Sequence, residues 1–134
     1  MFDLLSFVRV AAFAAIFGGI EYRYVYRREA PWTKQVEGFA EKPAFWTIAP
    51  YNAYFLFPAF IVVALSPSIT AWAGNTFLLA VLEDMAYFAW RGSRVRSGEW
   101  TTRLFGSLSI GGTVLPLWWP LASAVAVAFY LMPL

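Results

Sequence analysis

The apolar residues of this chain gather into four long segments with polar connections between them. The segments cover about Phe2–Ile20, Ala49–Leu65, Ile69–Trp90 and 104–132. A helix needs about 20 mostly apolar residues to cross the ~30 Å hydrocarbon core of a bilayer. The pattern therefore predicts an all-α integral membrane protein, a single domain of four transmembrane helices in a bundle.

The fourth apolar segment is longer than one straight span requires. It contains Pro116 and Pro120, and a proline inside a helix removes a backbone donor and kinks or breaks the helix. We expect one long, kinked span. The alternative is a re-entrant half-helix that ends at Trp119 and is followed by a short second piece.

The first segment is predicted to remain part of the protein as a span. A secretory signal begins with basic residues and ends at a small-residue cleavage site. Here the chain begins with Met1, Phe2 and the acidic Asp3, and a polar, tyrosine-rich stretch follows Ile20 directly.

Composition supports the membrane class and excludes several chemistries. Apolar residues make up 60% of the chain and charged residues 13%, where soluble domains have about 45–50% and about 25%. Aromatic residues add up to 20%, which suits the interfacial belts of membrane proteins. The chain has no Cys and no His, so disulfides, thiolate or imidazole metal sites and Ser–His catalysis are excluded. We predict no metal site and no cofactor.

The basic residues predict the orientation in the membrane. Nine of the ten Lys and Arg residues lie in two connections, Glu21–Thr47 and Arg91–Arg103. The positive-inside rule places both connections in the cytoplasm and both termini outside, as in a multi-pass protein of the cell membrane. The expected partners are the bilayer itself, anionic lipid headgroups, and a second copy of the chain or a larger membrane complex. Nucleic acid is not expected. The residues predicted to attract the headgroups are Arg91, Arg94 and Arg96.

The first basic connection is predicted to contain a short amphipathic helix over Pro31–Lys42. Trp32, Val36, Phe39 and Ala40 recur at helical spacing on one side, and charged residues occupy the other. Such a helix would lie in the inner interface as a packing element between two spans. A gate over a site below it is the alternative.

Polar residues inside the spans are the candidates for function, because ionisable groups in a bilayer are rare and costly. Glu83 is expected to face the bundle interior and to pair with Arg9 at a similar depth, whereas Asp84 diverges by about 100° around its helix. The candidates for binding a ligand or ion are Glu83, Asp84, Arg9, Asn52, Tyr87 and Asn75.

Three functions fit these residues. The favoured one is a small accessory or assembly subunit of a larger membrane complex, in which Arg9 and a carboxylate fix the helix register. The alternative is a small transporter or channel whose carboxylate binds a proton or a cation. A second alternative is a Mg²⁺-dependent enzyme acting on lipid headgroups, which would need Glu21, Glu83 and Asp84 to converge.

Two glycine pairs suggest where helices touch. Gly18-Gly19 and Gly111-Gly112 both lie in the inner halves of their predicted helices, and small residues let backbones approach closely in lipid. We therefore predict contact between the first and fourth spans.

Overall fold

The computed structural model describes residues 3–25, 52–103 and 105–133, and most of these residues are helical. The elements are α1 (Leu4–Ile20), the π-helix η1 (Glu21–Val25), the π-helix η4 (Asn52–Leu56), α3 (Phe57–Val63), α4 (Ile69–Arg91), α5 (Trp100–Arg103), β1 (Ser107–Ile110), β2 (Thr113–Pro116) and α6 (Trp118–Leu131). The predicted helical class is confirmed, and the small two-stranded hairpin is an addition to it.

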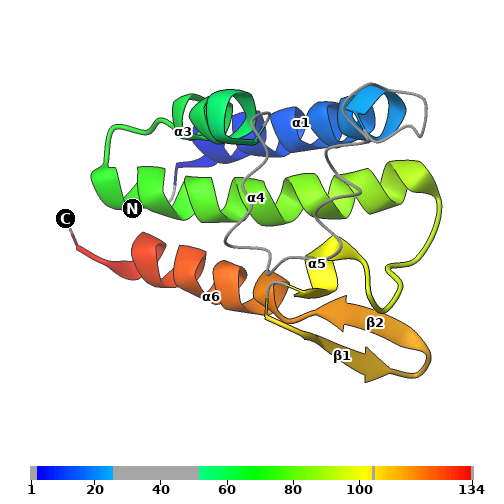
Figure 1. The fold of residues 1–134 in the computed structure, drawn as a ribbon. Coiled ribbons are helices and arrows are strands. Elements are labelled where there is room, and N and C mark those ends of the chain that lie inside the picture. The colour runs from blue at the N-terminus through cyan, green and yellow to red at the C-terminus, as the bar shows by residue number, and fades with distance from the viewer. Residues whose placement is uncertain (1–2, 26–51, 104, 134) are drawn as a thin grey trace.

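Helix α4 lies in the centre of the molecule. Helices α1 and α3 cover one side of it and α6 covers part of the other, with α5 and the hairpin beyond the first turn of α6 (Figure 1). Both ends of the described chain and the turn between α3 and α4 lie at one end of the bundle, here called the termini end. The opposite end carries the connection from Gly92 to Glu99 and is called the basic end.

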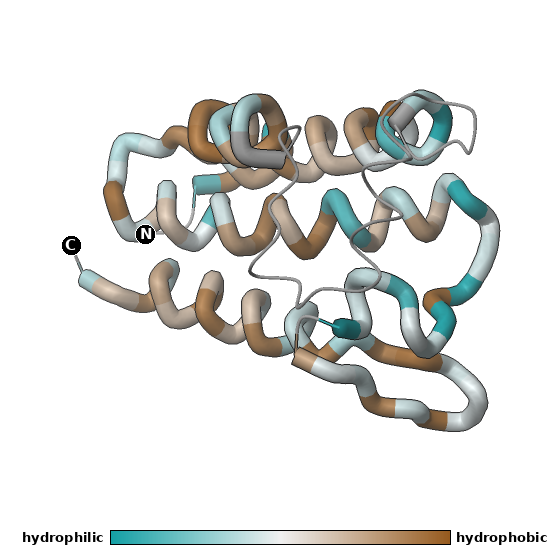
Figure 2. The backbone as a smooth tube through the Cα atoms, in the orientation of Figure 1, coloured by the Kyte–Doolittle hydropathy of each residue, from teal (hydrophilic) through white to brown (hydrophobic). Residues whose placement is uncertain are grey.

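The core follows one stripe of α1. Val10, Ala14 and Phe17, at helical spacing, pack with Phe60 of α3 and Leu79 of α4, and all five are buried. Apolar residues also cover the outward sides of the helices, as the brown and tan tube of α6 shows in Figure 2. Many large apolar residues are thus exposed on the outer sides of the helices.

The two long helices begin at capping side chains. The Asp3 carboxylate accepts hydrogen bonds from the backbone N–H groups of Leu5 and Ser6 and from the Ser6 hydroxyl, and the hydroxyl bond keeps the pKa of Asp3 below its usual value. The Ser68 hydroxyl caps α4, which ends at Gly92 in the left-handed conformation (φ 65°). The predicted bounds of these two segments are therefore close to the observed ones.

Among the described residues, one helical stretch is long and apolar enough to cross a membrane. It comprises α1 and most of η1, from Leu4 to Tyr24, and by length and composition it suits a membrane span as well as a signal sequence. The stretches Tyr54–Val63 and Trp118–Leu131 are apolar but shorter. Helix α4 has the length, 23 residues, and carries Glu83 and Asp84 in its second half.

The expectation for the fourth segment is wrong in its first half. Residues 107–116 form an antiparallel hairpin, and α6 begins only at Trp118. Gly111 and Gly112 occupy the two turn positions with φ of 55° and 78°, which a two-residue hairpin of this kind requires. Pro120 lies in the first turn of α6, where backbone N–H groups have no acceptor within the helix. The absence of an N–H on proline therefore costs no helical hydrogen bond there. The proline therefore neither kinks a helix nor ends a re-entrant one.

The predicted contact between the first and fourth segments at their glycine pairs is also wrong. Gly18 packs against α4, where an added Cβ would lie 2.7 Å from the backbone nitrogen of Tyr87 and 2.9 Å from the carbonyl oxygen of Glu83. Gly111 and Gly112 have nothing within 4 Å of the position of a Cβ. Gly18 thus serves close helix packing, and the second pair serves the hairpin turn.

The amphipathic helix predicted over Pro31–Lys42 lies outside the described residues.

Candidate functional site

Three acidic side chains are buried near the basic end, two of them where α1 and η1 meet α4 and one on the side of α4 that faces α5 and α6. Glu21, Glu83 and Asp84 are exposed to only 3%, 5% and 1%. Glu21 is the first residue of η1, one turn beyond Gly18, and the contact of Gly18 with the backbone of Glu83 brings the two helices together at this level. Buried charges normally need partners, so the partners of these acids decide what the site can do.

Glu21 and Glu83 bind each other. A hydrogen bond joins their side chains across the interface between η1 and α4. An ionised carboxylate can only accept hydrogen bonds, so a bond between two carboxyl groups requires a proton on one of them. In the described part of the chain, the Oε1 atom of Glu83 is buried without a partner. The pair is therefore a candidate site for one shared proton, with the Oε1 atom of Glu83 as a further acceptor.

Asp84 belongs to a separate network that ties α4 to α5 and α6. Its Oδ2 atom accepts hydrogen bonds from the Thr101 hydroxyl at 2.6 Å and from the Trp119 indole N–H at 2.7 Å. The Thr101 hydroxyl in turn accepts a bond from the indole N–H of Trp118 at 2.8 Å. These donors satisfy one oxygen of the carboxyl group and fix two tryptophans at the start of α6.

The two acids of α4 thus point to different partners, as their spacing around the helix predicts. Glu83 turns to Glu21, and Asp84 turns to α5 and α6. Within the described ranges, no group of three or more acidic residues is placed to hold a metal ion. A Mg²⁺ site would need three carboxylates to converge, and these three side chains do not converge.

The expected pair of Glu83 and Arg9 is wrong. The guanidinium of Arg9 instead donates to the carbonyl oxygen of Val63 at 2.8 Å and to that of Leu65. Both carbonyls belong to the end of α3 and the chain after it, where helical partners run out. Arg9 consequently binds the chain at the termini end.

Asn75 joins helices in the same way. Its amide nitrogen donates to the carbonyl oxygen of Ala64 at 3.1 Å, and its amide oxygen accepts from the Tyr130 hydroxyl at 2.7 Å. The residue is only 2% exposed and lies between the chain after α3 and α6. Asn75 is thus a buried connector of three segments.

The other two candidates lie near the basic end. The Tyr87 ring makes an edge contact with the Tyr22 ring at 6.1 Å between centroids, and the guanidinium of Arg91 lies 5.8 Å from it. Tyr87 lies one helical turn after Glu83 in α4, towards the basic end. Asn52 is the first residue of η4, and its side chain is outside the description.

The three arginines predicted to attract anionic headgroups differ in their surroundings. Arg91 makes a bidentate ion pair with Glu99, with the shorter contact at 2.7 Å, and its guanidinium lies 4.5 Å from the centre of the Phe88 ring. Arg94 and Arg96 are exposed. The charge of Arg91 is thus already compensated within the protein.

The sequence did not predict Glu21 as the partner of Glu83, nor Thr101 and Trp119 as the partners of Asp84. The signal for Glu21 was present, because it follows Gly18-Gly19 at the level where α1 can approach another helix. For Thr101 and Trp119 the sequence carries no comparable signal, since 17 and 35 residues separate them from Asp84.

No protein-family model, curated protein or solved structure significantly matches this chain.

Proposed function

We propose that this chain is a small multi-pass membrane protein in which the pair of Glu21 and Glu83 takes up and releases a proton. Four spans are proposed. The first is α1 with η1, the second is η4 with α3, the third is α4 and the fourth is α6. At 1.5 Å per residue, α4 is about 34 Å long, enough for the hydrocarbon core, whereas α6 is about 21 Å long and would cross only part of it. The hairpin would lie in the interface, because its unpaired backbone edges exclude it from hydrocarbon.

The proposed orientation places the termini end outside and the basic end in the cytoplasm. It is supported by the charges: the connection between α4 and β1 carries Arg91, Arg94, Arg96 and Arg103, while the turn Ser66–Ser68 has no basic residue. Both ends of the described chain lie at the same end of the bundle as that turn (Figure 1). The carboxyl pair then lies near the cytoplasmic surface, within reach of protons from that side.

The observation that carries the proposal is the hydrogen bond between two buried carboxyl groups from different helices. Such a pair favours the binding of one proton, because two hydrogen-bonded carboxyl groups are not both ionised. The unpartnered Oε1 atom of Glu83 offers the place where a proton or a water molecule can enter. Proton transport is the function that this arrangement supports best.

Flux measurements in liposomes test the proposal. The purified protein in vesicles with an internal pH-sensitive dye should admit protons when a membrane potential is imposed, and Glu83→Gln should abolish the flux while leaving the helical content unchanged. Asp3→Asn is the matched control, because it makes the same acid-to-amide change at a cap where Asn serves equally well. Flux that survives Glu83→Gln, or that does not exceed that of empty vesicles, would refute proton transport by this pair.

The second candidate remains an accessory or assembly subunit of a larger membrane complex. It is favoured by the use of polar side chains as connectors, since Arg9, Asn75 and Asp84 each bind a neighbouring segment. Purification from the native membrane in mild detergent separates the two candidates. A stoichiometric larger partner supports the accessory function, and a homogeneous preparation of this chain alone speaks against it. The Mg²⁺-dependent enzyme is not proposed, because Asp84 turns away from the carboxyl pair.

A further inference from the structure

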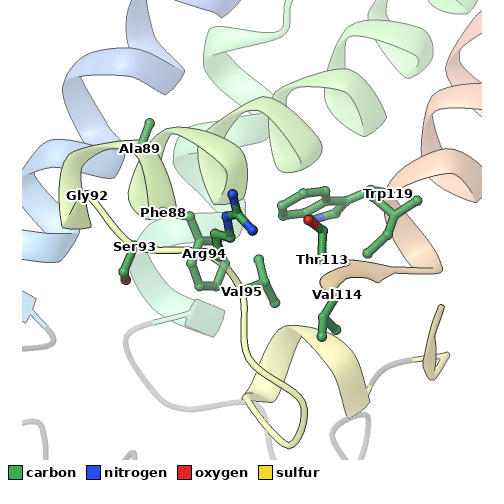
Figure 3. A pocket seen from close by; sticks show the side chains of 10 residues that line it. Phe88, Ala89, Gly92, Ser93, Arg94, Val95, Thr113, Val114 and Trp119 are labelled. Carbon is green, nitrogen blue, oxygen red and sulfur yellow. The ribbon is translucent and has the colours of Figure 1, made fainter. Parts of the chain in front are cut away.

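A pocket of about 390 Å³ lies at the basic end, between the start of the Gly92–Glu99 connection and strand β2. Its volume is within the roughly 300–1,000 Å³ of small-molecule sites. Figure 3 shows its lining side chains, which come from the end of α4, the connection, β2 and the start of α6. Its walls are mostly apolar: Phe88, Ala89, Val95, Val114, Leu115 and Trp119.

Two of these walls are held in place by the rest of the structure. Trp119 donates its indole N–H to Asp84, and its ring contacts the Phe88 ring with 6.1 Å between centroids. Val95 is only 8% exposed although it lies in an irregular connection. Trp119, Phe88 and Val95 are therefore fixed by contacts with the rest of the protein.

One cation belongs to this apolar pocket. Arg94 lines it, and Figure 3 shows its side chain among the lining residues together with Phe88 and Trp119. Neighbouring Arg91 is neutralised by Glu99, whereas no side chain in the described part of the chain pairs with the guanidinium of Arg94. An uncompensated guanidinium beside apolar walls suits a ligand with an anionic head and an apolar tail.

We propose that this pocket binds one anionic phospholipid, with the acyl chain against Val95, Val114 and Trp119 and the phosphate on Arg94. The inference rests on the membrane location in the proposed function, which places the basic end at the cytoplasmic headgroups. It does not depend on proton transport. Anionic lipids are concentrated at such surfaces and are attracted by exposed arginines, at about 1 kcal/mol per charge. The pocket adds a defined place for one lipid to this general attraction.

Titration of the detergent-solubilised protein with short-chain phosphatidylglycerol, and with phosphatidylcholine of the same chain length, tests the proposal. The protein should bind phosphatidylglycerol more tightly. Arg94→Gln should weaken that binding about fivefold, the factor that corresponds to about 1 kcal/mol. Arg96→Gln is the control, because it removes the same charge from the same connection but from outside the pocket lining; it should weaken binding clearly less than Arg94→Gln does.

A bulky substitution tests the acyl-chain site separately. Val114→Trp should weaken binding of both lipids, and Ala89→Leu repeats the filling from the exposed side of α4 in case the first variant does not fold. Equal effects of Arg94→Gln and Arg96→Gln would show diffuse attraction and overturn the proposal, as would lipid binding unaffected by filling. Extraction of the protein from native membranes with alkaline carbonate reports on the membrane location alone, so its failure is distinguishable from failure of the pocket.

Discussion

Gly18→Ala should separate α1 from α4 and disturb the carboxyl pair. The new Cβ would lie 2.7 Å from the backbone nitrogen of Tyr87 and 2.9 Å from the carbonyl oxygen of Glu83, where ordinary contact begins at 3.4 Å. These are backbone atoms of a helix, so relief requires a shift of the whole helix rather than of one side chain. Overpacking of this kind costs about 1–3 kcal/mol, and the better helix propensity of Ala returns about 1 kcal/mol. We expect a net loss of up to about 2 kcal/mol in the free energy of unfolding.

Thermal unfolding in detergent, followed by circular dichroism, measures this loss. Gly19→Ala is the control one residue away, because its Cβ would meet the Trp90 side chain at 2.9 Å, and a side chain can move. Gly18→Ala should lower the midpoint by several degrees and Gly19→Ala by less. Equal stability of the wild type and Gly18→Ala would refute the close approach of α1 and α4 at this glycine.

Three further predictions concern the connectors and the orientation. Tyr130→Phe removes the donor to the Asn75 amide oxygen and should lower the free energy of unfolding by about 1 kcal/mol in denaturant titration; unchanged stability would contradict that bond. Arg9→Met loses two bonds to carbonyls at the end of α3 and should cost about 1 kcal/mol without affecting the carboxyl pair, whereas loss of proton flux would revive the abandoned pairing with Glu83. In intact cells, an impermeant thiol reagent should label a cysteine at Ser68 and not one at Ser97; the reverse pattern would invert the orientation.

The bounds of the two long helices could be predicted because local signals surround them. The third apolar segment, predicted over Ile69–Trp90, is observed as Ile69–Arg91, between the Ser68 cap and Gly92. The hairpin was missed because a mostly apolar stretch of this length suits a helix as well as strands. Its signal was Gly111-Gly112 between short runs with β-branched residues, which is a turn pattern more than a packing pattern.

The candidate site was predicted only in part, because burial can be inferred from one helix but partners depend on the packing of two. Glu83 is buried as expected from its face of α4. Arg9 is not its partner because Gly18, and not a residue near Arg9, faces Glu83. Nine residues separate Arg9 from Gly18, about 13 Å along α1. The depths of Arg9 and Glu83 in the membrane were counted from the ends of their apolar segments, and such a count cannot locate the contact between Gly18 and Glu83.

Infrared spectroscopy of the carboxyl groups tests the central claim most directly. If Glu21 and Glu83 share a proton, the protein in detergent at neutral pH should show the carbonyl stretch of a protonated carboxylic acid, a band that ionised surface acids lack. Glu83→Gln and Glu21→Gln should each remove the band, and Glu99→Gln, which changes an acid paired with an arginine, should leave it. Absence of the band in the wild type, or its persistence in Glu83→Gln, would contradict a proton-holding carboxyl pair.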